Sequence, residues 1–279
     1  MKINKDSLKA RVNNISKEYS ISPNVVYNRF FFDAFLSRLS RSEYKDKFIL
    51  KGGLYLSSIL GIDNRSTMDI DFYIKRINME RSIIFKAIEE ICSIELDDNI
   101  TFRVLAIESI KEDDRYGGFQ IKVQGCLESV RYEFGIDVAT GDPITPSDKA
   151  YDYKCLVSKE VLSLRAYSLE TVISEKLQTV LSRGITNSRS KDYYDLFIAL
   201  KTPSLPVDKK TLKTAFENTC KYRQFSISKN EALSLIDAIE NNEIVKKHWK
   251  VYCDKNKYAT NINFNDVILT IKFLIEIVY

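Results

Sequence analysis

The run Lys51-Gly52-Gly53, followed 16 residues after its second glycine by Asp69-Ile70-Asp71-Phe72, decides the expected fold. The apolar run Phe48-Ile49-Leu50 before the glycines predicts a short buried strand, and residues 54–60 after them predict a helix. Gly52-Gly53 is therefore expected at a strand-to-helix turn. There the bare backbone can approach a phosphate and the helix N-terminus favours an anion. Two adjacent glycines also fit an ordinary turn, so the interpretation depends on the aspartates that follow.

Asp69 and Asp71 alternate with apolar residues, which predicts a strand over 67–74 with both carboxylates on one face. Carboxylate oxygens are the ligands that Mg²⁺ prefers, and paired carboxylates hold the ions of two-metal catalysis. We expect a third carboxylate from a neighbouring strand. Asp137 is the candidate, because it lies opposite the apolar face of a predicted strand over 130–139, and Glu133 on the same face is the weaker alternative. The predicted metal is Mg²⁺ or Mn²⁺.

A lone Asp-x-Asp is also typical of a solvated strand face, so the glycine turn upstream is what favours a metal site. The metal strand is preceded by further donors that can reach a phosphate or hold the turn. For Arg65 an ordinary salt bridge is an equally good explanation, whereas Thr67 is more typical of a site residue. The expected triphosphate-binding residues in this part of the chain are Lys51, Gly52, Gly53, Arg65, Ser66 and Thr67.

The pattern of the chain changes near residues 141–168, and two domains are expected. Residues 1–165 predict an α/β (α+β) domain with N-terminal helices, with strands over 48–50, 67–74, 102–107, 118–125 and 130–139 and two short strands over 155–157 and 161–164. Residues 166–279 read as helical throughout. The first 150 residues carry 22 basic and 23 acidic side chains, whereas the remainder carries 20 and 15. A basic second half suits a nucleic-acid partner, although a solvated surface is nearly as good an explanation.

Several classes of protein are disfavoured by what the sequence contains. The five cysteines form no Cys-x-x-Cys pair, which argues against a zinc knuckle or a disulfide framework and favours free thiols in a reducing cytoplasm. His248 is the single histidine, so Ser-His-Asp chemistry is not expected. The longest apolar run, 267–275, is too short to span a bilayer and contains Lys272, so no membrane segment is expected. A cytoplasmic monomer is the expectation.

A second block of polar residues lies in the helical half. Lys176 is mid-helix beside an apolar face, where snorkelling to water is the commoner role and binding an anion the rarer one. Asp192 and Asp195 are i, i+3 neighbours near a predicted helix start, where acidic residues are favourable in any case. Spacing alone therefore leaves the role of this block open.

Four motifs occur in order: Lys-Gly-Gly-x-x-Leu, Arg-x-Thr-x-Asp-Ile-Asp-Phe, Ser-Glu-Lys-Leu and Arg-x-Lys-Asp-Tyr-Tyr-Asp-Leu. Over residues 48–200 the chain resembles the AbiEii/AbiGii toxin family of nucleotidyltransferases. The resemblance implies a polymerase-β-like nucleotidyltransferase core with a mixed sheet, followed by an all-helical C-terminal domain. It also implies that Lys176 contacts the triphosphate and that Asp192 lies near the active site. Many relatives have Gly-Ser where this chain has Gly52-Gly53.

The resemblance further implies a function. Characterised members of the family use a nucleoside triphosphate (NTP) to add nucleotides to the 3′ acceptor end of tRNA, which blocks aminoacylation and growth. They are the toxins of bacterial toxin–antitoxin and phage abortive-infection systems, so tRNA or another RNA and a cognate antitoxin are the expected partners. Two alternatives stay open: the same chemistry on a small molecule or a protein hydroxyl, and a degenerate domain that only binds RNA or a partner protein.

Overall fold

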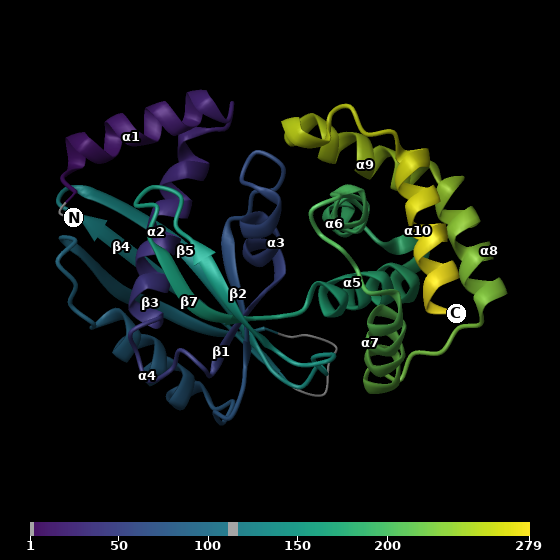
Figure 1. The fold of residues 1–279 in the computed structure, drawn as a ribbon, viewed down its shortest axis with the longest axis horizontal. Coiled ribbons are helices and arrows are strands. Elements are labelled where there is room, and N and C mark those ends of the chain that lie inside the picture. The colour runs from purple at the N-terminus through teal and green to yellow at the C-terminus, as the bar shows by residue number, and fades with distance from the viewer. Residues whose placement is uncertain (1–2, 111–116) are drawn as a thin grey trace. The chain divides into compact units, whose positions relative to one another are not determined.

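The computed structural model describes residues 3–110 and 117–279, and the chain forms two compact units (Figure 1). The first unit comprises Met1–Gly141 and Lys149–Ala166. The second comprises Asp142–Asp148 and Tyr167–Tyr279. The predicted domains, 1–165 and 166–279, stay a prediction about which parts fold independently.

The first unit is built on a mixed seven-stranded sheet with the order β3-β4-β5-β2-β1-β7-β6. Its strands are β1 Phe48–Lys51, β2 Asp69–Ile74, β3 Ile100–Ile110, β4 Gly118–Leu127, β5 Val130–Ala139, β6 Lys149–Lys154 and β7 Val161–Ala166. Strand β2 pairs antiparallel with β1 and parallel with β5, so it lies at the centre of the sheet. Strands β4 and β5 form a tight hairpin at Glu128-Ser129, where Leu127 and Val130 are paired directly across the turn.

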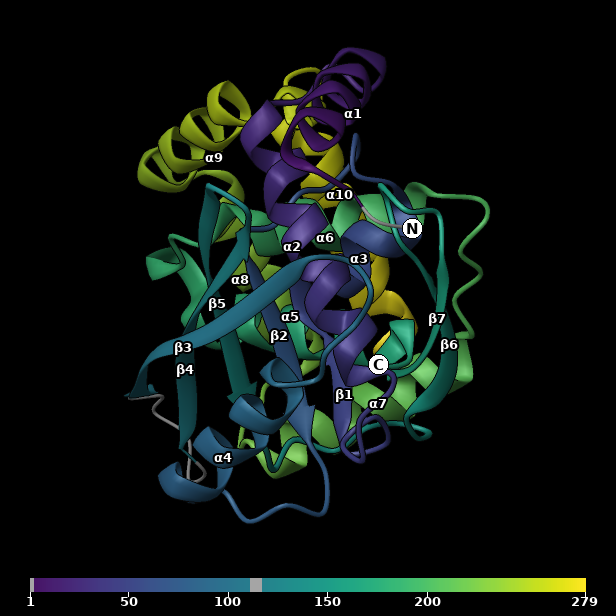
Figure 2. The ribbon, with the colours of Figure 1, turned by 90° about the vertical axis from the view of Figure 1, so that its left-hand side faces the viewer.

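The two faces of the sheet differ because side chains alternate along each strand. On one face Phe72 and Phe134 are buried against Phe35 of the helix α2, with ring centroids 6.5 and 6.3 Å from that of Phe35. Figure 2 shows α2 and α4 lying in front of this face. The opposite face of β2 and β5 therefore carries the polar residues of both strands, Asp69 and Asp71 among them.

The helices of the first unit are α1 Lys5–Glu18, α2 Pro23–Leu39, α3 Gly52–Leu60 and α4 Arg81–Cys92. Helix α2 begins with Ser22 as N-cap and Pro23 in its first turn, residues that favour the start of a helix. Nearly all of this helix is buried, including four phenylalanines and the polar residues Asn28, Arg29 and Asp33.

The second unit is helical, as expected. Its helices are α5 Leu169–Arg183, α6 Ser190–Lys201, α7 Lys209–Tyr222, α8 Lys229–Glu240, α9 Glu243–Lys255 and α10 Phe264–Val278. Helix α10 packs against α6, α7 and α8, and α5 packs against α6 and α7. The preceding segment Asp142–Asp148 joins this unit: the Thr145 N–H donates to Thr171 Oγ1 at 2.9 Å, and Arg223 forms a two-pronged ion pair with Asp142.

The predicted fold class, an α/β core with a mixed sheet followed by a helical part, is confirmed. One predicted strand is wrong. Residues 155–157 form no strand but begin the turn after β6, and the strand that pairs with β7 is Lys149–Lys154. Only Tyr153 is fully buried in β6, so its sequence lacks the apolar run that marks a strand. In the part of the chain that is described, no helix is long and apolar enough to cross a membrane.

Candidate functional site

The glycine turn closes directly over Asp71. Gly52 has a φ of +61°, and a Cβ there would lie 2.2 Å from Asp71 Oδ2. The Gly53 N–H, at the start of α3, donates to the same oxygen at 3.1 Å. Lys51, the last residue of β1, is paired with Asp71 across the two strands. The predicted phosphate turn and the predicted metal strand are thus in direct contact.

The residues before β2 lie against the other side of the turn. A Cβ at Gly53 would lie 2.8 Å from Thr67 Oγ1 and 3.3 Å from Arg65 Nη2. The Thr67 hydroxyl donates to the backbone oxygen of Asp69 at 3.3 Å, and buried Arg65 donates to the backbone oxygen of Ser66. Arg65, Ser66 and Thr67 therefore brace the start of the metal strand beside the glycines.

Asp137 lies beside Asp71, as the alternation along β5 predicts. The two residues are directly paired across the parallel β2 and β5 strands, and Asp69 is paired with Gly135. Asp137 Oδ1 accepts a hydrogen bond from Gln120 of β4 at 2.9 Å. Glu133, the weaker alternative, lies further along β5, where Lys122 forms a 2.6 Å ion pair with it and lowers the pKa of its carboxyl group. The geometry thus favours Asp137.

The three aspartates share one face but are turned toward different partners. Asp71 faces the glycine turn, Asp137 faces Gln120, and Asp69 Oδ1 lies 2.6 Å from where a Cβ of Gly135 would be. Among the described residues no group of three or more acidic, His or Cys side chains is arranged to hold a metal ion. The donor set nevertheless fits Mg²⁺, since it consists of carboxylate oxygens, each with several lone-pair positions.

Asn28 of α2 supports this site and was not anticipated from the sequence. Its side chain is fully buried, its Nδ2 donates to the backbone oxygen of Thr67 at 3.1 Å, and it lies 3.4 Å from Met68 Sδ. The next residue, Arg29, bonds to Asp33 on its own helix and to Ser57 Oγ of α3. A signal did exist: Asn28 and Arg29 interrupt a helix that is otherwise rich in aromatic residues, and polar groups buried in such a helix need partners.

Lys176 and Asp192 lie in the second unit. The Lys176 ammonium group is 2.7 Å from Asp192 Oδ1 and 2.8 Å from Asp195 Oδ2, and Arg189 Nε is 3.1 Å from Asp192 Oδ2. Burial alone would lower the pKa of Lys176, but the two carboxylates outweigh it and raise the pKa above its ordinary value. The Lys176 side chain therefore does not extend to water but forms ion pairs with two carboxylates. Asp195 belongs to this cluster, although the sequence analysis gave it no role in the site.

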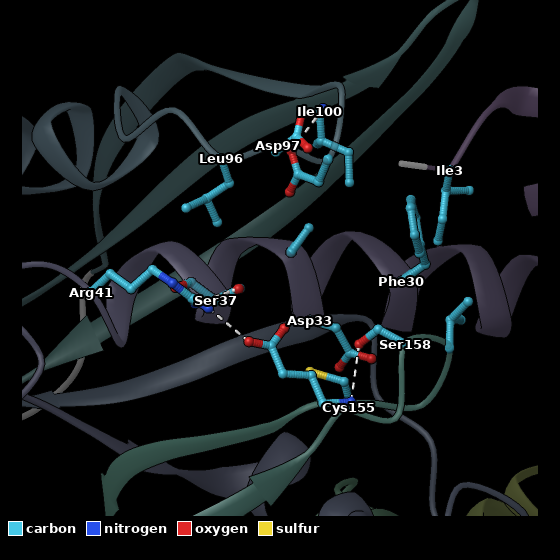
Figure 3. A pocket seen from close by; sticks show the side chains of 14 residues that line it. Ile3, Phe30, Asp33, Ser37, Arg41, Leu96, Asp97, Ile100, Cys155 and Ser158 are labelled. Atoms are coloured by element: carbon cyan, nitrogen blue, oxygen red, sulfur yellow. Dashed lines mark hydrogen bonds and ion pairs between the residues drawn. The ribbon is translucent and has the colours of Figure 1, made fainter. Parts of the chain in front are cut away.

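A cavity of about 460 Å³ also lies in the first unit (Figure 3), and none of the residues predicted for the site lines it. It is lined by α2, the segment before β3 and the turn between β6 and β7, and Asp33, Arg41 and Glu160 are among its polar groups. Arg41 is ion-paired with Glu160 at 2.7 Å, and Asp33 is paired with Arg29 at 3.1 Å. Because these charges neutralise one another, we assign this cavity no part in triphosphate binding.

Comparison with protein families shows to which family this chain belongs. The family described as nucleotidyl transferase AbiEii toxin, type IV toxin–antitoxin system, matches residues 34–268. The chain belongs to the AbiEii family. The match contains every residue predicted for the site, from Lys51 to Asp192, and the AbiEii family is one of nucleotidyltransferase toxins. Asn28 lies before the matched segment.

One solved structure shows the same fold. JHP933 from Helicobacter pylori is 16% identical, with 92% of each chain covered and a TM-score of 0.54. A second Helicobacter pylori structure, provisionally described as a nucleotidyltransferase, is 15% identical, with 92% of this chain and 96% of that chain covered and a TM-score of 0.48. At 16% identity the likeness to JHP933 shows the fold alone. No curated protein matches the chain.

Proposed function

We propose that this AbiEii-family protein is a metal-dependent nucleotidyltransferase toxin that transfers nucleotides from an NTP to RNA, at the 3′ acceptor end of tRNA. One observation carries the proposal: the glycine turn, Asp71 and Asp137 are in register on one face of the sheet, with Asp71 bonded to the turn. A phosphate-binding backbone and a row of carboxylates are thus adjacent, as phosphoryl transfer requires.

Different residues of the first unit have different roles in the proposed reaction. The turn at Gly52-Gly53 and the start of α3 bind the triphosphate through backbone N–H groups. The acceptor hydroxyl attacks the α-phosphorus, the bond to the β-phosphate breaks, and pyrophosphate leaves. A carboxylate on this face takes the hydroxyl proton. Thr67, Arg65 and Asn28 keep the metal strand in place beside the turn.

Asp69, Asp71 and Asp137 are the residues that would hold Mg²⁺ or Mn²⁺. A bound ion neutralises the developing charge on the phosphates and lowers the pKa of the attacking hydroxyl. The residues prepare the site by sharing one face, and Gly135 leaves the space that the Asp69 carboxylate occupies.

Three observations support RNA in the cytoplasm as the target of a toxin. The AbiEii family is a toxin family of a toxin–antitoxin system, which implies an antitoxin partner. Residues 151–279 carry five more basic than acidic side chains, which favours a polyanionic acceptor. No helix in the described part of the chain is long enough to anchor it in a membrane.

A labelling experiment tests the proposal. The purified protein is incubated with each α-³²P-labelled NTP in turn, with Mg²⁺ or Mn²⁺, and with total RNA, total protein or an aminoglycoside. We expect one or more NTPs to label RNA in the size range of tRNA, and chelation by EDTA or the change Asp71→Asn to abolish the label. Label in the protein or aminoglycoside reaction would move the function to the alternative acceptors, and no label in any reaction would favour a binding domain without activity.

A further inference from the structure

A hollow of about 320 Å³ opens beside Asp69 on the polar face of the sheet, and no motif accounts for it. It lies over β5, β4 and β3, whereas the glycine turn follows β1 on the other side of β2. The strand that carries Asp69 and Asp71 therefore separates the hollow from the phosphate-binding turn.

The floor of the hollow is low because one row of the sheet carries small residues. Asp69 is paired with Gly135, Gly135 with Lys122, and Lys122 with Ala106. Gly135 has no side chain and Ala106 only a methyl group, so the row is shallow on both sides of Lys122. The volume of the hollow falls at the lower end of the range for pockets that bind organic ligands.

The rim carries one lysine, Lys122, and the carboxylates of Asp69, Glu108 and Glu133, of which Glu133 is paired with the lysine. Lys122 Nζ is 2.6 Å from Glu133 Oε2, and Gln120 donates to Asp137. Met68, whose side chain is 49% exposed, adds an apolar edge. Gln120, Lys122 and the apolar edge of Met68 suit a flat group with donors and acceptors at its edge, such as a nucleobase with its ribose.

We propose that this hollow seats the 3′-terminal nucleoside of the acceptor RNA, with Lys122, Gln120 and Met68 around it. The inference rests on the proposed function. In an in-line displacement the attacking and leaving oxygens lie on opposite sides of the phosphorus. Since the triphosphate binds at the turn on one side of β2, the acceptor hydroxyl must approach from the other side, where the hollow lies.

Photocrosslinking tests the assignment without requiring turnover. The probe is a tRNA that ends in 8-azidoadenosine, irradiated with the full-length protein and mapped by mass spectrometry of the digested protein. We expect the crosslinks at Met68 or within the strands that carry Ala106 and Lys122. Crosslinks only elsewhere, or none, would overturn the proposal.

Two variants sharpen the test. Ala106→Trp fills the floor, and Lys122→Met removes the charge of the rim but keeps the aliphatic stem. Each should lower the crosslinking yield and raise the KM for RNA about tenfold, which corresponds to about 1.4 kcal/mol. The KM for the NTP should not change. Thr101→Trp, an exposed position on the same strand outside the hollow, is the matched control.

The outcomes of these experiments distinguish a failure of the proposed binding site from a failure of the proposed nucleotide transfer. A wild-type protein that labels RNA but crosslinks elsewhere would refute the hollow alone. A protein that crosslinks at the hollow but transfers no nucleotide would refute the transfer reaction and leave the binding site standing. Unchanged crosslinking by Ala106→Trp would refute the hollow even if its floor strand were crosslinked.

Discussion

Gly52 and Gly135 occupy two positions where a side chain would collide with an aspartate of β2. A Cβ at Gly52 would lie 2.2 Å from Asp71 Oδ2, and one at Gly135 would lie 2.6 Å from Asp69 Oδ1. Gly52 also has a positive φ, which strains any other residue. The two glycines thus fix where the carboxylates of the strand can lie. The position of Gly52 at a predicted strand-to-helix turn indicated its importance from the sequence. Gly135 makes room for Asp69 only because the register of β2 and β5 pairs these two residues, which the sequence does not reveal.

We predict that Gly135→Ala displaces the Asp69 carboxylate and lowers kcat for nucleotide transfer about 10²-fold, the cost of misplacing a reacting group by about 1 Å. The fold should survive, because the nearest obstacle is a side chain rather than backbone. Transfer kinetics and thermal unfolding measured side by side would show this. Gly117→Ala is the control, since a Cβ there meets nothing within 4 Å. Full activity in the Gly135 variant would contradict the site.

Asn28 acts through the backbone just before the metal strand. We predict that Asn28→Leu lowers kcat, because it leaves the carbonyl of Thr67 without its buried donor, a loss of about 1–3 kcal/mol. Asn14→Leu, the same change at an exposed position of α1, should keep both activity and stability. To separate positioning from general destabilisation, kcat is measured well below the unfolding temperature of each variant. A loss of stability without any change in kcat would restrict Asn28 to a structural role.

Patterns within one element predicted structure well, and pairings between elements did not emerge from them. The period-two alternation of β2 predicted the strand and the face of its aspartates, and the same argument placed Asp137 on the polar face of its own strand. That Asp137 pairs with Asp71 depends on strand order and register. The acidic pair in α6 looked like ordinary acids of a first helical turn. Only packing of α5 against α6 brings Lys176 between Asp192 and Asp195, and no local period reports a contact across 16 or more residues.

We predict that Lys176→Met destabilises the protein by about 3–5 kcal/mol, because it removes the ammonium group from buried Asp195 and leaves buried Asp192 with the half-exposed Arg189. Adding Asp192→Asn and Asp195→Asn should recover much of that loss, since the charges are then removed together. Denaturant unfolding measures both effects, and Lys191→Met, an exposed neighbour on α6, is the control. Recovered stability with activity still absent would assign Lys176 a role in catalysis beyond its ion pairs.

The same cluster makes a prediction about pH. The pKa of Lys176 is raised in the folded protein above its ordinary value of 10.5. A lysine with a raised pKa stabilises the fold fully below the unfolded pKa, and this contribution is lost as the pH rises through the folded value. The difference in unfolding free energy between wild type and Lys176→Met should therefore be constant from about pH 7 to 9 and shrink above about pH 10.5. A difference that grows in alkali would contradict the ion pairs.

The family match covers residues 34–268 and thus both units, yet part of the support for the site lies before it. Asn28 and Arg29 precede the matched segment and reach Thr67 and Ser57 from α2. The motifs of the predicted site are therefore recognisable from sequence, whereas the contacts by which Asn28 and Arg29 hold neighbouring segments in place are seen only in the fold. Any shortened form of the protein should accordingly keep α2 if it is to keep the geometry of the glycine turn.

The distribution of charge over the whole chain leads to a prediction about RNA binding. Exposed lysines that contact phosphates release counterions, so affinity falls as salt rises, with a slope of about −0.7 per phosphate contact on single strands. Lys247 and Lys250 of α9 are exposed and belong to the basic half. We predict that Lys247→Glu with Lys250→Glu weakens RNA binding and reduces the magnitude of the salt slope by about 1.4.

Lys9→Glu with Lys17→Glu on α1 makes the same change in net charge and should leave the slope unchanged. Filter binding of tRNA across a salt series measures both variants, and equal slopes in the two would show that net charge alone, rather than a basic surface on α9, governs RNA binding.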